Sequence, residues 1–384
     1  MRRRRRGGGA LNAGRQAERA SPHPARGVIP SRAVLLSHVR LVHVGPFDDL
    51  SLSFEGEGGA PRRLVVLFGG DGVGKTSLLS AIASTRPGYA VAQPRSRGED
   101  SPPALVVTDW MLGTDDPARA HPLRVASPNA RLDEPEEAAI LRRREQSFFE
   151  RRAAEGGFVL VALSGSRWFS RTSIVLTTPE RSILRYDVRA AASFDDATRT
   201  DLARETKQVL AFAPLAAAVA REERDESKRR RLDALDRALR EVLAALLEGS
   251  GATYLGVDPL RFEPIFERGD GQRVDFDDLG RSARHAVAFG ALSLRALAAA
   301  HPSGDPRLAE GVVLIDDIEA QQPLHRQRSL AARLRAALPN VQWIVTTSSP
   351  AVALGCDLSD VIALRREPSS GRVELHEGPD AVLH

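Results

Sequence analysis

Glycines, a lysine and a threonine occur together near residue 70 at a spacing that suits phosphate binding. The apolar run Leu64–Phe68 is followed by the letters GGDGVGKTS, which contain the pattern G-x-x-x-x-G-K-[ST]. Glycines in such a loop let backbone N–H groups point inward, and the start of the next helix adds a partial positive charge. We expect Lys75 to reach the β- and γ-phosphates of a nucleotide and Thr76 to ligate Mg²⁺. The predicted nucleotide-binding loop comprises Gly69, Gly70, Asp71, Gly72, Val73, Gly74, Lys75, Thr76 and Ser77.

Acidic residues follow a second apolar run. Val312–Ile315 predicts a buried strand, and Asp316 and Asp317 come directly after it. At the carboxyl end of a strand beside the phosphate loop, the first acid can hold Mg²⁺. The second acid is placed to act as a general base that directs water at the γ-phosphate. We therefore expect Asp316 to bind metal and Asp317 to be catalytic; the alternative is a pair of solvated acids that cap the next helix.

A parallel sheet is needed to position both segments. Leu64–Phe68 reads as a buried parallel strand, with a helix over Ser77–Ala83. Two preceding strands, over Val34–Val44 and Leu50–Phe54, are predicted to form a hairpin that leads into the loop. We expect Lys75 to lie in an exposed part of this loop and outside the core.

The middle of the chain predicts another hairpin and then a helical region. Ala104–Leu112 and Pro122–Ala126 are candidate hairpin strands, followed by a charged helix over Glu134–Ala154 and a strand over Phe158–Leu163. Helices are expected over Asp195–Glu248. Two further candidate strands are Ser173–Thr177 and Ser182–Tyr186. Apolar residues at heptad spacing are expected to face the core and not a coiled-coil partner, because they span only about two heptads: Leu232, Leu235, Leu239, Val242 and Leu246.

The order of elements predicts an α/β P-loop protein. A helix over Arg326–Leu338 and a strand over Val341–Thr347 follow the acidic residues. The acids lie too far downstream of Lys75 for a small GTPase, and no guanine-reading N-K-x-D motif follows Asp277-x-x-Gly280. ATP is therefore favoured over GTP as the nucleotide.

Composition limits the class of protein. The chain has 384 residues, 42% of them hydrophobic, and a single cysteine, Cys356, which excludes an internal disulfide and fits a cytoplasmic location. No apolar run reaches the roughly 18 residues of a membrane span; the longest, Val209–Ala220, is interrupted by Pro214. We therefore expect no membrane partner.

Positive charge is concentrated at the start of the chain. Residues 1–32 contain nine arginines and one acid, Glu18, for a net charge of +8. Because the whole chain carries +4, the remainder carries −4. The segment has few large apolar residues, so it is expected to be disordered. It could bind phosphates of a nucleic acid non-specifically; the alternatives are a segment with no role or an artefact of start-site choice.

The amino-acid sequences and the order of these segments resemble those of the ABC-type ATPase heads of the RecF/SMC/OLD-like group. VRLVHVGPFDDLSLSF and LVVLFGGDGVGKTSLL resemble its first hairpin and phosphate loop, and DDIEAQQPLHRQRSLAARLRAALPNVQWIVTTSSP resembles its second acidic motif, helix and next strand. The resemblance covers about residues 33–365. It implies a mixed sheet with an antiparallel β flank and a helical lobe, in one domain over 33–384 with a helical insert at about 134–250. It also implies that two heads enclose ATP between them.

Three positions depart from the pattern of that group. Asp317 stands where the group usually has glutamate, so its carboxylate is one methylene short. Ser348 replaces the usual switch histidine before Ser-Pro; its hydroxyl can hydrogen-bond a phosphate but carries no charge. The signature loop matches only loosely over residues 279–284, where Ser282 near a helix start would face the ATP of a partner. An ordinary capped helix is the alternative for this stretch.

The resemblance implies an ATPase that dimerises on ATP and requires Mg²⁺, and we expect it in the cytoplasm. The three departures predict slow turnover. Its implied setting is DNA repair or defence against mobile elements and phage. DNA and a separately encoded effector such as a nuclease are candidate partners. A non-catalytic, nucleotide-gated binding module is the alternative from another class, and the ATP-binding subunit of a transporter is a third reading.

The charge distribution predicts how any sequence-independent DNA binding would behave. It should depend strongly on salt and should weaken sharply on deletion of residues 1–32, because these carry +8 against −4 for the remainder. Titration of duplex DNA with both chains at two salt concentrations measures this. Equal affinity of the truncated chain would show that the remainder contains a basic groove of its own.

Overall fold

The computed structural model describes residues 34–381, except 57, 94–102, 113–121, 129, 153–157, 175–177, 190–193 and 195–199. The Arg-rich segment 1–32 and its predicted disorder lie outside the described residues.

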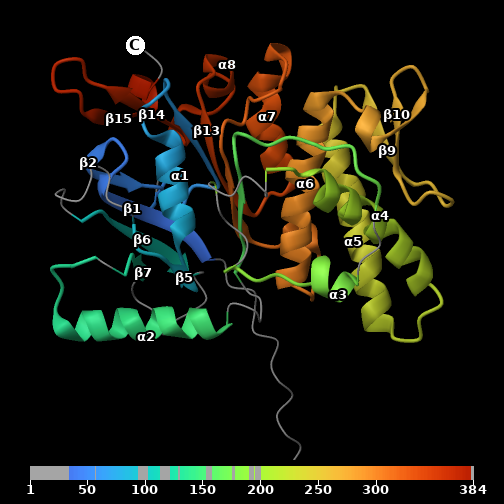
Figure 1. Ribbon diagram of the computed structural model, residues 1–384, viewed down its shortest axis with the longest axis horizontal. Helices are drawn as coiled ribbons and strands as arrows, with labels where there is room; N and C mark the ends of the chain where they lie inside the picture. Colours follow the sequence, from blue (N-terminus) through green and yellow to red (C-terminus); the bar gives the residue numbers. More distant parts are fainter. Residues whose placement is uncertain are drawn as a thin grey trace, which may run out of the picture. The chain divides into compact units, whose positions relative to one another are not determined.

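A six-stranded sheet contains the strands that precede the phosphate loop and the acidic residues (Figure 1). Its strands, in spatial order, are β15 (Val373–Glu377), β14 (Val361–Arg366), β3 (Leu64–Phe68), β13 (Val341–Thr347), β12 (Gly311–Ile315) and β8 (Leu160–Leu163). All neighbouring pairs are parallel except β14 and β15, which are antiparallel. Strands β3 and β12 are uninterrupted apolar runs because a parallel sheet is covered on both faces, and β13 is equally buried although it contains Gln342, Thr346 and Thr347. The predicted mixed α/β sheet is thus confirmed.

An antiparallel four-stranded sheet flanks this core, in the order β2 (Phe47–Ser53), β1 (Val34–Val44), β6 (Leu105–Leu112) and β7 (Leu123–Ala126). Both predicted hairpins are present, since β1 pairs with β2 and β6 pairs with β7. Helix α1 (Lys75–Ser84) contacts strand β1 of this flank. The first hairpin therefore packs directly against the helix that follows the phosphate loop.

A third group of elements consists of helices and a small sheet. The helices are α4 (Ala203–Ala220), α5 (Glu226–Leu247) and α6 (Arg281–Ala300), and the sheet order is β11 (Arg273–Asp275), β10 (Pro264–Arg268), β9 (Ala252–Val257). Pro214, expected to interrupt an apolar run, lies inside α4. The heptad-spaced residues of α5 are all buried, as predicted for a core-facing helix.

The remaining elements lie along the chain between those already described or after them. They are β4 (Thr85–Arg86), β5 (Tyr89–Ala90), α2 (Glu136–Arg152), α3 (Pro179–Ser182), α7 (Leu324–Ala337), α8 (Pro350–Ala353) and short 3₁₀ helices at Phe276–Asp278, Pro306–Leu308, Leu358–Asp360 and Gly378–Ala381. None of the helices among the described residues is both long and apolar enough to cross a membrane.

The strand predicted over Ser182–Tyr186 is wrong. Ser182 ends helix α3, and the residues that follow pair with no strand among the described residues. Instead, the Tyr186 hydroxyl accepts from the Leu160 N–H at 2.7 Å and donates to the Leu160 carbonyl at 2.8 Å. A side chain thus satisfies the free edge of β8, where a strand was expected. Of the other predicted strand, Ser173 and Ile174 are not in a strand and 175–177 lie outside the described residues.

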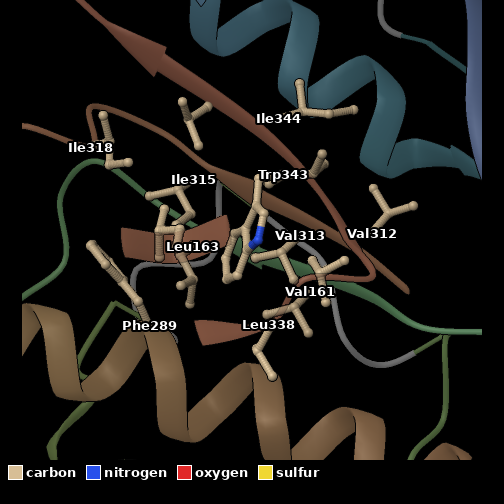
Figure 2. Close-up of a cluster of buried hydrophobic side chains, with 14 of the residues drawn as sticks. Val161, Leu163, Phe289, Val312, Val313, Ile315, Ile318, Leu338, Trp343 and Ile344 are labelled. Atoms are coloured by element: carbon tan, nitrogen blue, oxygen red, sulfur yellow. The ribbon is translucent and has the colours of Figure 1, made fainter. Parts of the chain in front are cut away.

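Alternate residues of the central strands face opposite layers (Figure 2). Trp343 and Val313 point toward helix α6, where Phe289 lies, whereas Ile344 points to the other side of the sheet. Trp343, Ile344 and Phe289 are each fully buried. This packing fixes the ends of β12 and β13, from which the acidic residues and Ser348 extend.

Candidate functional site

The phosphate loop joins β3 to α1 as predicted. Lys75 is the first residue of α1, and the preceding Gly74 has φ 94°. A Cβ at Gly74 would lie 2.5 Å from Pro46 Cγ and 2.6 Å from Phe47 Cζ, so only glycine fits against the first hairpin. The hairpin and the loop are therefore fitted to each other.

Lys75 is not exposed, and that expectation is wrong. It is 7% exposed, and its ammonium donates to the carbonyls of Gly69 and Gly70, each at 2.8 Å. The loop surrounds the Lys75 side chain, so residues close to Lys75 in sequence bury it. The ammonium is held at the centre of the loop, where nucleotide phosphates are expected.

The other loop residues differ in exposure. The exposed residues of the loop are Gly70, Asp71, Gly72 and Thr76, whereas Val73 is buried. Ser77 is half-buried against the first hairpin, because a Cβ at Gly45 would lie 2.8 Å from Ser77 Oγ. The loop thus presents glycines and a hydroxyl outward and anchors itself through Val73 and Ser77.

Asp316 meets the phosphate loop. The Thr76 hydroxyl donates to Asp316 Oδ2 at 2.9 Å, and the Thr346 hydroxyl donates to Asp316 Oδ1 at 2.6 Å. Strand β13 lies between β3 and β12 in the sheet and supplies Thr346. A hydroxyl and a carboxylate brought together in this way are the hard oxygen donors that Mg²⁺ prefers.

The donor set fits Mg²⁺ delivered with a nucleotide. Among the described residues, no group of three or more His, Cys, Asp or Glu side chains could hold a metal ion alone. Mg²⁺ is usually held through one or two carboxylates together with substrate phosphates. Thr76 and Asp316 provide the protein's share of such a set.

Asp317 is held in an unusual backbone conformation. Its φ is 45°, and its N–H donates to the Thr346 hydroxyl at 2.8 Å. Burial, reinforced by the charges of Asp316 and Glu319, raises the pKa of its carboxyl group. A raised pKa makes the carboxylate a stronger proton acceptor, as a general base requires.

Glu319 is a site residue that the sequence reasoning missed. The Ser348 N–H and hydroxyl both donate to Glu319 Oε1, at 2.7 Å and 2.8 Å. The other oxygen, Oε2, is buried without a hydrogen-bond partner among the described residues. Ser348, expected to contact a phosphate, is thus engaged by a carboxylate. The third acid in D-D-I-E was the available signal.

The loop after β8 supplies two more residues that were missed. A Cβ at Gly165 would lie 2.8 Å from Asp317 Oδ2 and 3.2 Å from Asp316 Oδ2, so glycine allows the loop to approach both carboxylates. Arg167 is 5% exposed, and burial lowers its pKa to about 10 despite the nearby acids. The short sequence S-G-S-R gives no signal for either role.

Ser282 lies apart from this cluster. Helix α6 begins at Arg281, one residue before the expected start. The Ser282 carbonyl accepts from Gln322 Nε2 at 3.2 Å, so the segment after the acidic residues contacts the start of α6. The structure therefore brings Lys75, Thr76, Asp316 and Asp317 together and places Ser282 on a separate helix end.

Comparisons with known proteins agree with this architecture at the level of fold. The sequence matches no protein-family model and no curated protein. An SMC head bound to the C-winged helix domain of ScpA is 14% identical, with a TM-score of 0.50, covering 89% of this chain and 98% of that chain. The SMC head domain from Thermotoga maritima is 11% identical (TM-score 0.43, 89% and 98% covered), and a Pyrococcus furiosus SMC head with an extended coiled coil is 14% identical (0.46, 90% and 96%). The chain has the ABC-type P-loop fold of SMC heads.

Replacing Thr346 by valine should destabilise the protein. The isosteric change removes the hydroxyl that contacts Asp316 and Asp317, and leaves a buried carboxylate oxygen unpaired, at a cost of about 1–3 kcal/mol. Urea unfolding measures the loss. Thr206→Val is the matched control, because the Thr206 hydroxyl is fully buried without a hydrogen-bond partner among the described residues. An equal effect of both substitutions would contradict the role given to Thr346.

Proposed function

We propose that this chain is an ATPase head that binds Mg·ATP, dimerises on ATP and hydrolyses it slowly. The hydrogen bond of 2.9 Å between Thr76 and Asp316 carries the proposal, because it joins the phosphate loop to the acid-tipped strand. These two residues would hold Mg²⁺, which when bound neutralises charge on the β- and γ-phosphates. The loop from Gly69 to Ser77 would bind the phosphates through its backbone N–H groups.

Two charged side chains would act on the γ-phosphate and the attacking water. Lys75, held in the loop by two carbonyls, would exchange these contacts for phosphate oxygens. Asp317 would take the proton from water as it attacks phosphorus, and its raised pKa suits that role. Its shorter side chain places the carboxylate farther from the water than glutamate would, which is the reason for expecting slow turnover.

Dimerisation would complete the site. Ser282 lies in the first turn of α6, a helix of 20 residues, and would offer its hydroxyl and neighbouring N–H groups to the γ-phosphate of the partner's ATP. We place the protein in the cytoplasm, in DNA repair or defence, with DNA and a separately encoded nuclease as candidate partners.

A nucleotide-gated binding module without catalysis is the second candidate. It is favoured by the contact between Glu319 and Ser348, which occupies the expected phosphate-sensing hydroxyl. In that case ATP would switch the conformation, and turnover would be absent.

Lys75→Ala should weaken ATP binding about 10–100-fold, because a hydrogen bond to a charged group contributes about 1.5–3 kcal/mol. Calorimetry with Mg·ATP measures the affinity, and circular dichroism checks that the variant folds. Lys228→Ala is the control, since Lys228 is an exposed lysine paired with Glu223. Unchanged affinity in Lys75→Ala would remove the proposed nucleotide site.

Asp317→Asn should lower turnover about 10²–10⁴-fold and leave ATP-dependent dimerisation intact, because the amide cannot accept the proton from water. The parent chain should turn over well below the roughly 10 s⁻¹ typical of enzymes. Phosphate release and light scattering measure the two properties. Glu319→Gln is the matched control, since its amide oxygen can still accept from Ser348. A loss confined to Glu319→Gln would make Glu319 the base, and a parent chain that dimerises without turnover would favour the binding module.

A further inference from the structure

Arg167 lies beneath the acidic residues and is not part of the mechanism above. It follows β8 and is 5% exposed. Its Nη1 donates to the carbonyls of Asp316 at 2.6 Å and Ser164 at 2.9 Å, and its Nη2 donates to the carbonyl of Asp317 at 2.7 Å. One guanidinium thus donates hydrogen bonds to main-chain carbonyls of both acids and of the loop beside them.

The same guanidinium also contacts helix α6. Its central carbon lies 4.9 Å from the centre of the Phe289 ring. Phe289 is seven residues after Ser282, a spacing that places both on one face of the helix. Arg167 therefore contacts both the acid-bearing segment and helix α6, whose first turn contains the proposed trans-acting Ser282.

Burying a guanidinium is costly unless its donors are used. No carboxylate lies within salt-bridge distance of Arg167 among the ion pairs of the described residues. Its Nη1 and Nη2 donate to main-chain carbonyls instead, and only Nε is buried without a hydrogen-bond partner among those residues. One of these belongs to Asp317, whose φ of 45° is rare for a residue with a side chain. Such a conformation persists only where the surroundings hold it.

We propose that Arg167 is a positioning residue that fixes the backbone of Asp316 and Asp317 against helix α6, so that both carboxylates point at the nucleotide site. The proposal rests on the proposed ATPase function and adds a residue to it. A planar fork with several donors is required, because one ammonium cannot hold the two carbonyls in the same geometry.

Arg86 provides a matched control for a purely structural role. It is also fully buried, donates to main-chain carbonyls of Ala83, Val188 and Arg189, and lies 4.2 Å from the ring centre of Tyr89. It lies in β4, after α1, and these hydrogen bonds reach neither Asp316 nor Asp317. Arg86→Lys thus imposes the same chemical change away from the two acids.

Arg167→Lys should lower kcat about 10–100-fold, as is usual when a residue that orients metal ligands is changed. It should also reduce the gain in ATP affinity on adding Mg²⁺ by about tenfold, and leave affinity without Mg²⁺ unchanged. Calorimetry with and without Mg²⁺ and phosphate release measure these quantities. Arg86→Lys should lower the Tm and leave all of them at the parent values.

A second variant covers the case in which Arg167→Lys fails to fold. In Arg167→Ala, millimolar guanidinium should restore part of the Mg²⁺ response, because a free guanidinium can occupy the vacated fork. Equal behaviour of Arg167→Lys and Arg86→Lys, or absence of rescue, would overturn the positioning role alone. A parent chain that shows no Mg²⁺-dependent ATP binding would overturn both this role and the proposed function.

Discussion

The hydroxyl of Thr346 is the contact on which the candidate site depends. It donates to the Asp316 carboxylate and accepts from the Asp317 N–H, so a residue of β13 holds both acids that follow β12. Asp316 in turn accepts from Thr76 in the phosphate loop. Three segments distant in sequence are therefore joined by a short chain of hydrogen bonds within a buried sheet, where such bonds are strong and costly to break. The buried strands β12 and β13 around it fix its geometry.

Crowding of negative charge is the second constraint on this region. Asp316, Asp317 and Glu319 lie within four residues, and burial penalises the charged form of Asp317. Lys75 and Arg167 oppose that penalty at Asp317. The two cations differ in their contacts, because Lys75 faces the phosphate loop whereas Arg167 is committed to carbonyls behind the acids. The arrangement places one cation in the phosphate loop and the other on the main chain of the two acids.

Departures from the pattern of RecF/SMC/OLD-like heads have different structural meanings. Asp317 keeps a carboxylate at the end of β12, with a shorter reach. Ser348 does not stand free in place of the usual histidine, since Glu319 accepts from both its N–H and its hydroxyl. Helix α6 still begins at Arg281, although the signature sequence is irregular. The fold of the head is thus preserved where its sequence motifs vary.

The sequence by itself determined the phosphate loop, the acid-tipped strand, both hairpins and the core-facing side of α5, because each depends on local patterning of glycines, charges and apolar residues. It also predicts a nucleoside triphosphate bound by Lys75 and Thr76. Only the tertiary structure decided that β13 separates β3 from β12, that Lys75 is buried, and that Tyr186 satisfies the edge of β8. The contacts of Glu319 and Arg167 were likewise found only in three dimensions. The acid of D-D-I-E is visible in the sequence, but strand order brings the serine and the main-chain groups near these side chains, and local residue spacing does not show this.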